Sequence, residues 1–168
     1  MATKTAPKMT MFPTRHDLSE TVRQEVGNFL NQVLATTSDL YSQIKQAHWN
    51  VKGKDFIQLH ELFDELGEEV SAYVDDVAER VTALGGTAFG TNRMSAEASL
   101  IKEYPVEAVE GREHLTALAD RYGAYAKILR EGIDRMEDLG DKDSADLLTE
   151  ISRTIDKRLW FIESHLQA

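Results

Sequence analysis

The sequence predicts an all-α fold, a bundle of four long helices. Apolar residues recur at intervals of three and four along four segments, which is the period of an amphipathic helix. Only three prolines occur in 168 residues, and no stretch alternates apolar and polar residues as a half-buried strand would. This length suits one domain with one core.

The first helix is expected to start near Leu18, where an apolar stripe begins that continues to Ile44. Asp17 and Glu20 have the spacing of a capping box, in which each side chain satisfies a free backbone N–H group of the first turn. Residues 50–54 break the apolar pattern and therefore predict a short turn.

The second helix is expected over residues 55–84. Asp55 and Gln58 form a second pair with capping spacing, and Gly85 and Gly86 stop the helix. At about 1.5 Å per residue, this helix is roughly 43 Å long.

The remaining chain predicts a long connection and two further helices. Residues 87–105 connect the halves, with a short helix within Ser95–Lys102 and Pro105 as a terminator. The third long helix is expected over Val106–Leu139, and the fourth follows Gly140. Two short links and one long crossover, which can run the length of the bundle, give the connectivity of a ferritin-like four-helix bundle.

Composition limits the chemistry open to this chain. Without cysteine, only carboxylates and imidazoles remain as strong metal ligands. The net charge of −10 makes the body repel nucleic acid, while residues 1–16 are expected to form a flexible basic tail ahead of the bundle domain, residues 17–168. No leader pattern and no apolar run of membrane-spanning length is present, so a cytoplasmic protein is expected.

Two of the five histidines are expected to meet. His48 and His60 each lie six residues from Lys54, so an antiparallel hairpin that turns there places both imidazoles at the same height. A single histidine is more often a packed side chain than a ligand, and this interpretation is kept for His114 and His165.

Three carboxylates share a stripe of the second helix with His60. At about 100° per residue, Asp64, Asp75 and Glu79 all lie within about 100° of His60, away from the apolar stripe. The pair His60 and Asp64 is roughly 22 Å along the helix from the pair Asp75 and Glu79, whereas ligands bind metals at about 2.0–2.2 Å. One chain therefore cannot close the site, but a two-fold axis near residues 69–70 would bring the pairs of two chains together.

Small residues lie at that expected crossing. Gly67 and Ser71 occupy the same stripe and would let two helices approach closely. The alternative is that the acids of this helix are only a solvated face. If metal binds, imidazole and carboxylate ligands suit Fe(II), Mn(II), Zn(II) or Co(II), and two divalent ions suit an oxidation step in which zinc could not change valence.

From Thr14 onward the chain resembles the Dps proteins (DNA-binding proteins from starved cells), a branch of the ferritin superfamily. The resemblance lies in the motif Lys45–Asn50 and in a five-residue frame with intervals of 12, 4, 11 and 4 residues, namely His48, His60, Asp64, Asp75 and Glu79. Shorter matches are Ala78–Arg80, Leu84–Gly86, Tyr104-Pro105, Ala119–Tyr122, Asp156-Lys157 and Trp160-Phe161.

The resemblance implies a hollow homododecamer built from two-fold dimers, with a ferroxidase site for two iron ions at each dimer interface. Fe(II) would be oxidised there, preferably by hydrogen peroxide, and the ferric product stored inside as mineral. Zinc or manganese could also occupy the site. Its ligands would come from two chains: His48, His60 and Asp64 from one, and Asp75 and Glu79 from the other.

The resemblance also implies roles for residues outside that frame. Trp49 would accept stray oxidising equivalents beside the site, unless it is a packed core indole. Asp141, Asp143 and Asp146, near the start of the fourth helix, would line pores through which iron passes, unless they only favour a helix N-terminus.

DNA binding would depend on the tail. Residues 1–15 contain Lys4, Lys8 and Arg15 and no acid, a charge of +3, so the rest of the chain carries −10 − 3 = −13. Twelve such tails could bind DNA without sequence preference and associate the protein with the nucleoid. Two other hypotheses stay open: a mainly structural protein that condenses DNA, and a helical adaptor that binds no metal.

Overall fold

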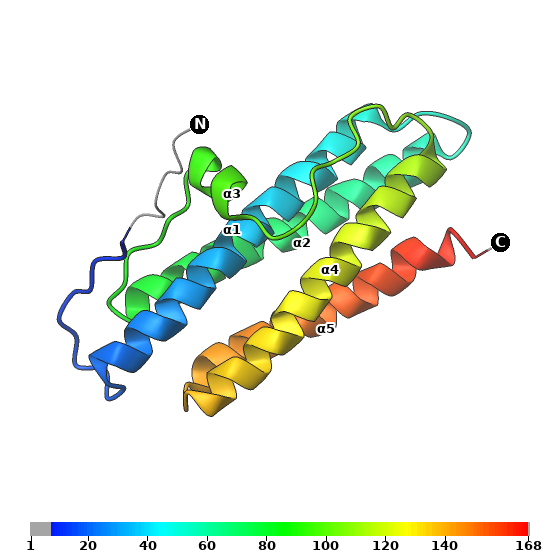
Figure 1. Ribbon diagram of the computed structural model, residues 1–168. Coiled ribbons are helices and arrows are strands. Elements are labelled where there is room, and N and C mark those ends of the chain that lie inside the picture. Colours follow the sequence, from blue (N-terminus) through cyan, green and yellow to red (C-terminus); the bar gives the residue numbers. More distant parts are fainter. Residues whose placement is uncertain (1–7, 168) are drawn as a thin grey trace.

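The chain folds into two helical hairpins, as the computed structural model of the protein shows (Figure 1). The structure describes residues 8–167. One hairpin pairs α1 (Glu20–Asn50) with α2 (Phe56–Ala83), and the other pairs α4 (Gly111–Asp138) with α5 (Lys142–Ser164). A short helix, α3 (Asn92–Ala98), lies in the crossover between them. The predicted all-α class and order of helices are confirmed.

The caps of the first two helices differ from the prediction. Ser19, not Asp17, precedes α1, and its hydroxyl accepts a hydrogen bond from the Val22 N–H group. The Asp17 side chain is 99% exposed, so the expected capping box with Glu20 was wrong. Asp55 does precede α2, but its side chain accepts no capping hydrogen bond.

The short helix and α4 are also displaced from their expected bounds. Thr91 caps α3 by accepting from the Met94 N–H group, which starts this helix three residues before the predicted position. Residues 106–110, expected to be helical, precede α4. The Glu113 carboxylate accepts from the N–H groups of Val109 and Glu110, and these two bonds fix the helix start at Gly111.

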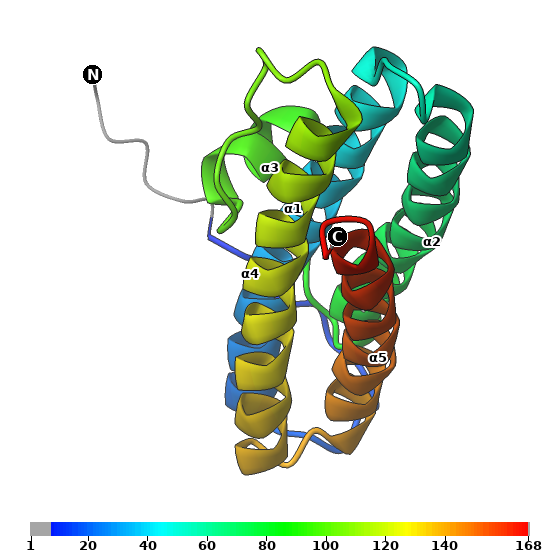
Figure 2. The same cartoon turned by 90° about the vertical axis from the view of Figure 1, so that its right-hand side faces the viewer.

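Polar side chains fasten the crossover to the bundle. Asp39 of α1 accepts from the Ser99 hydroxyl, and the Gln43 amide donates to the carbonyl oxygen of Lys102. The buried guanidinium of Arg121 donates to the carbonyl oxygen of Glu103 and to the Gln43 side chain. In Figure 2, α3 and the crossover lie on the side of the bundle away from α2 and α5. The polar face of α2 is therefore left uncovered by this segment.

One apolar core joins the four long helices. Leu30 and Leu34 of α1, Phe63 of α2 and Leu118 of α4 are fully buried, together with apolar residues of α5. Tyr41 has the spacing of the apolar stripe that runs from Leu18 to Ile44, but it is exposed at the surface of α1.

The chain before α1 packs against the bundle where the structure describes it. Met9 is buried on Gly27 and Gly86, where an added Cβ would lie 2.8 Å from Met9 atoms. The Phe12 N–H group donates to the carbonyl oxygen of Gly85 over 2.7 Å. These contacts hold residues 9–12 at the bundle end, whereas the predicted tail was expected to be free. Lys4 lies outside the described residues, and the domain boundary after residue 16 stays a prediction.

Candidate metal site

The two histidines predicted to meet lie face to face. His48 belongs to the last turn of α1, and His60 follows the first turn of α2. Their rings stack with centroids 3.8 Å apart and an interplanar angle of 21°. His48 is buried and His60 is half-buried. The prediction that the hairpin brings these imidazoles to the same height is confirmed.

Each of these rings is held by the backbone of the other residue. Nδ1 of His48 lies 2.9 Å from the carbonyl oxygen of His60, and Nδ1 of His60 lies 2.9 Å from the carbonyl oxygen of His48. Because a carbonyl oxygen only accepts, both Nδ1 atoms carry the hydrogen. In the neutral imidazole each Nε2 then keeps its lone pair, which is the form that binds a metal ion.

Asp64 lies next to this pair, one turn after His60. Its Oδ1 atom is 3.8 Å from Nε2 of His48 and 2.6 Å from Nζ of Lys45. The hydrogen bond from Lys45 holds the pKa of Asp64 below its ordinary value, and the positive charge of Lys45 adds to this effect. The carboxylate is therefore ionised at neutral pH, as a metal ligand has to be.

Gly67 contacts its own chain rather than a second one. It is buried against α1, where an added Cβ would lie 3.2 Å from Cδ of Lys45 and 3.7 Å from the Ile44 side chain. The expectation that Gly67 eases the approach of a second chain was wrong, because the stripe that carries His60 turns toward α1 at this point. Ser71, the other small residue of that stripe, is exposed.

The second pair of predicted ligands lies on later turns of α2. Asp75 and Glu79 are both exposed. They are separated from His60 and Asp64 by roughly 22 Å of helix. Among residues 8–167, no three His, Asp or Glu side chains are grouped closely enough to hold a metal ion. Within one chain the frame is therefore divided into two groups that lie apart, His48, His60 and Asp64 in one and Asp75 and Glu79 in the other.

Trp49, His114 and His165 differ in burial and in their hydrogen bonds. Trp49 is 68% exposed, so the alternative of a packed core indole was wrong for this chain. His114 is buried, and its Nδ1 atom is hydrogen-bonded to the Tyr104 hydroxyl over 2.5 Å, as expected for a packed histidine. His165 is exposed at the end of α5 and is bonded to the backbone of Phe161.

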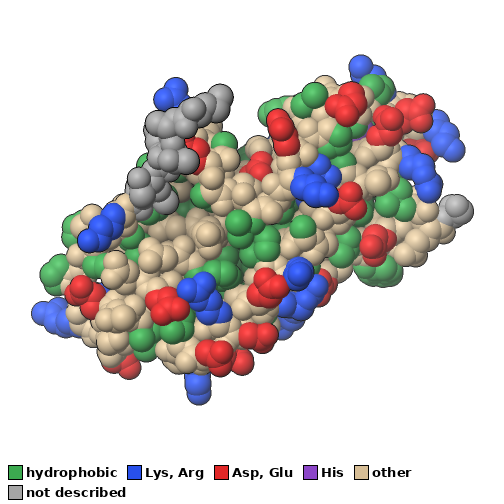
Figure 3. All heavy atoms as spheres, viewed as in Figure 1, with side chains coloured by type: hydrophobic (Ala, Val, Ile, Leu, Met, Phe, Trp, Pro, Cys, Tyr) green, Lys and Arg blue, Asp and Glu red, His purple; other side chains and the backbone are tan. Residues whose placement is uncertain are grey.

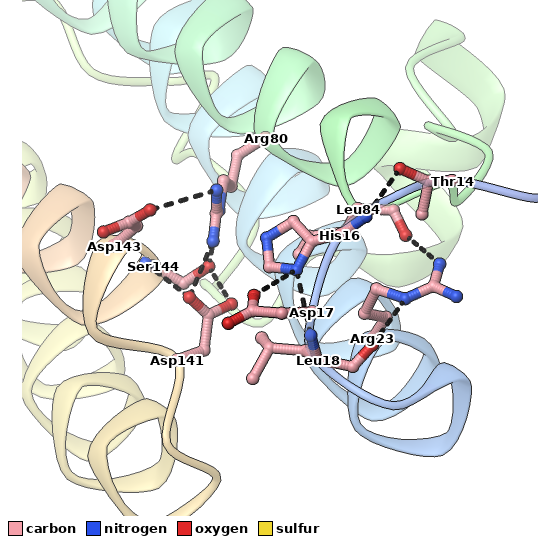
Figure 4. Close-up of polar contacts among 10 residues, drawn as sticks. All are labelled: Thr14, His16, Asp17, Leu18, Arg23, Arg80, Leu84, Asp141, Asp143 and Ser144. Atoms are coloured by element: carbon pink, nitrogen blue, oxygen red, sulfur yellow. Dashed lines mark hydrogen bonds and ion pairs between the residues drawn. The ribbon is translucent and has the colours of Figure 1, made fainter.

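One of the three acids predicted to line a pore is buried (Figure 4). Asp141 is 2% exposed and caps α5, where its carboxylate accepts from the N–H and hydroxyl groups of Ser144. The Arg80 guanidinium of α2 donates to the same carboxylate over 2.6 Å. Asp141 therefore joins α5 to α2 and cannot line an open channel, so that expectation was wrong. Asp143 and Asp146 are exposed.

Lys45 and Arg80 are the charged neighbours of the frame that the sequence did not single out. Lys45 precedes His48 by three residues, so both lie on one face of α1, and this spacing was the available signal. Arg80 follows Glu79 directly, but its partner Asp141 is 61 residues away along the chain. Only the packing of α5 against α2 reveals that contact.

One face of the molecule carries mixed charge. On the face drawn in Figure 3, acidic and basic side chains alternate with apolar patches, and no continuous basic area is visible there. None of the helices in residues 8–167 has a stretch both long and apolar enough to cross a bilayer.

Comparison with known proteins gives consistent matches over nearly the whole chain. The family model for the ferritin-like domain matches residues 27–168. A DNA protection during starvation protein of Agrobacterium fabrum is 42% identical over 154 residues, which cover 92% of this chain and 95% of that protein. A Mycobacterium smegmatis Dps structure has a TM-score of 0.90 at 34% identity and covers 95% of this chain and 96% of its own.

A more distant structure adds the class of the superfamily. The Dps protein of Vibrio cholerae, described as a member of a broad superfamily of ferritin-like diiron-carboxylate proteins, has a TM-score of 0.87 at 26% identity. The match covers 94% of this chain and 99% of that one. The fold is therefore ferritin-like, with the short α3 between the bundle helices.

Proposed function

This chain belongs to the Dps family of the ferritin-like superfamily, and from that premise we propose that it is a ferroxidase and iron-storage protein. Fe(II) is its substrate, and hydrogen peroxide is the preferred oxidant. Two Fe(II) ions each give one electron to a peroxide molecule, which takes up two protons and leaves as two water molecules. Removing both reactants together suppresses hydroxyl-radical formation.

The observation that carries this proposal is the pair of reciprocal bonds between His48 and His60. They leave a lone pair on Nε2 of each ring, and Nε2 of His48 lies 3.8 Å from the ionised Asp64 carboxylate. Imidazole nitrogen and carboxylate oxygen form a ligand set that suits Fe(II) and tolerates its change of valence. These three residues would bind and orient the substrate ion.

The other half of the site would come from a second chain. Asp75 and Glu79 are exposed and too far from the histidines to act with those of their own chain. In a two-fold dimer, two copies of α2 that cross antiparallel would supply both halves twice. Six such dimers would form the hollow dodecamer in which ferric mineral accumulates, and its mass would be about 12 × 18.9 ≈ 227 kDa.

Two auxiliary roles are part of the proposal. Trp49 follows His48 directly in the chain and is exposed, and it would accept stray oxidising equivalents. Asp143 and Asp146 are the exposed acids near the start of α5 and would attract cations to a pore between chains.

Stopped-flow oxidation of Fe(II) by peroxide tests the central proposal. We expect the His48→Ala, His60→Ala double variant to lose at least about 100-fold in rate, because it lacks two ligands of the substrate ion. His165→Ala, which changes an exposed histidine outside the proposed ligand set, is the control and should keep the parent rate. Equal rates in the parent and the double variant would refute the ferroxidase.

Light scattering tests the assembly separately. A mass near that of twelve chains is expected for an iron-storing shell. A monomer or simple dimer that binds no metal would instead favour the helical adaptor.

A second candidate function is DNA condensation, supported by the segregation of charge along the chain. Residues 1–15 carry +3 against −13 for the rest, and Lys8 and Arg15 are exposed. Contacts with phosphates from many tails would add up in an assembly. We expect a low-salt gel shift that is lost when Lys4, Lys8 and Arg15 are all changed to Gln. Absence of any shift with the parent protein at low salt would end this candidate.

A further inference from the structure

We infer that Gly67 is a positioning residue for the candidate site. Because Gly67 has no side chain, the aliphatic part of Lys45 packs directly on its backbone, a contact called the seat below. This contact places the Lys45 ammonium where it holds the Asp64 carboxylate. The inference rests on the proposed function, because the metal site that Gly67 would help to position belongs to that proposal. The contacts themselves, however, lie within one chain, between α1 and α2.

The Lys45 side chain is the neighbour that packs most closely on Gly67. A Cβ added there would lie 3.2 Å from Cδ of Lys45, closer than such carbons normally approach. Its other neighbours, in Ile44 and Tyr41, would lie at 3.7 and 3.8 Å, which is ordinary van der Waals contact. An alanine would therefore fit the helix pair and crowd only the lysine stem.

Lys45 is unusually enclosed for a lysine. Its side chain is 19% exposed, whereas lysines normally keep most of the side chain in water. The stem is fixed at one end by α1 and at the other by the 2.6 Å contact between Nζ and Oδ1 of Asp64. Because Cδ is only two bonds from Nζ, a displacement of Cδ by a few tenths of an ångström also moves the ammonium.

The position of this ammonium affects metal binding at Asp64. Oδ1 of Asp64 contacts Nζ of Lys45 and lies 3.8 Å from Nε2 of His48. A divalent cation that binds Oδ1 of Asp64 and Nε2 of His48 would have to share this oxygen with Lys45 or take it from Lys45, and two cations repel each other at such distances. The contact between Gly67 and Lys45 thus determines how strongly the Lys45 ammonium competes with the substrate ion for Asp64.

Lysine acetylation of the assembled, metal-free protein tests the seat directly, with the rate at each lysine read by mass spectrometry. In Gly67→Ala we expect Lys45 to react at least about threefold faster than in the parent, because a displaced ammonium is less protected. The reference Lys127 is exposed on α4 and should not change. Asp64→Asn, which removes the partner, should also accelerate Lys45.

Gly123→Ala is the matched control. Gly123 is another glycine inside a helix, and an added Cβ there meets nothing within 4 Å. Alanine favours a helix over glycine, so neither variant should melt below the parent. A Lys45 rate in Gly67→Ala equal to that in the parent would overturn the inference.

Cobalt(II) titration then tests whether Gly67 acts through Lys45. We expect Gly67→Ala and Lys45→Gln each to bind Co(II) at least about threefold more tightly than the parent. The double variant should bind like Lys45→Gln alone, because the seat has no function without the lysine. A full, additive effect of Gly67→Ala in the Lys45→Gln background would contradict the inference.

The two experiments separate the inference from the proposed function. A parent protein that binds no Co(II) would contradict the metal site, while the acetylation rates would still decide the role of Gly67. Normal Co(II) binding with unchanged acetylation would reject the role of Gly67 and leave the ferroxidase proposal intact.

Discussion

Nδ1 of His48 and Nδ1 of His60 each donate to the backbone carbonyl oxygen of the other residue, over 2.9 Å in both directions. The two bonds form only when α1 and α2 are aligned so that His48 lies opposite His60. The turn between them contains Gly53 with φ of 112°, a conformation that residues with a side chain rarely adopt. The metal-binding form of both rings is thus prepared by the hairpin of a single chain.

Asp141→Ala should destabilise the protein strongly. It removes the cap of α5 and the closer of the two carboxylates that pair with the Arg80 guanidinium, which leaves only the exposed Asp143 carboxylate at 3.8 Å. We expect a loss of about 3 kcal/mol or more in the free energy of unfolding, measured by urea denaturation. Asp143→Ala is the control, since that side chain is 83% exposed and should change stability little. Equal effects of the two substitutions would show that Asp141 is not buried.

Two buried tyrosines should differ in their response to replacement by phenylalanine. The Tyr125 hydroxyl is 2.6 Å from the Thr37 hydroxyl, so Tyr125→Phe should lower the free energy of unfolding by about 1 kcal/mol. The Tyr122 hydroxyl is fully buried and has no hydrogen-bond partner among the described residues, so Tyr122→Phe should leave stability unchanged or raise it. Urea denaturation of both variants checks this, and a larger loss in Tyr122→Phe would contradict it.

His114 should make stability depend on pH. Burial lowers the pKa of His114 in the folded protein below its ordinary value of 6.5. As the pH falls below 6.5, the unfolded chain takes up a proton that the folded protein resists, so this residue lowers stability at acid pH. His114→Gln can keep the bond to Tyr104 but does not titrate. Melting curves at pH 7.5 and 5.5 should show a smaller difference for His114→Gln than for the parent.

The control for this pH effect is His165→Gln. That histidine is exposed, and its replacement should leave the difference between the two melting temperatures unchanged. An identical pH dependence in His114→Gln and the parent would rule out a contribution from His114.

The helices and the meeting of His48 with His60 could be predicted because both depend on local spacing. The period of the apolar residues determines which segments are helical, and a hairpin with a short turn brings His48 opposite His60. The helix ends were less predictable. Several residues near each start could act as caps. Ser19 caps α1 where Asp17 was expected, and the bonds to the Glu113 carboxylate start α4 at Gly111 rather than at the predicted Val106.

The contacts missed by the sequence prediction link residues that are distant along the chain. Arg80 and Asp141 meet only when α5 packs against α2, and no spacing rule connects them. Gly67 was assigned to a contact with a second chain because its angle around α2 matched that of His60, but that side of the helix rests on Lys45 of α1. Helical phase alone does not distinguish a neighbour in the same chain from one in another chain.

The central claim is that each ferroxidase site is shared between two chains, and mixing two inactive variants tests it most directly. One variant carries His48→Ala and His60→Ala, and the other carries Asp75→Ala and Glu79→Ala. After the two are unfolded and refolded together in equal amounts, half of the dimers should be mixed, and each mixed dimer should contain one intact site out of two. The account predicts recovery of about a quarter of the parent rate of Fe(II) oxidation. A mixture no more active than the two variants refolded separately would contradict it.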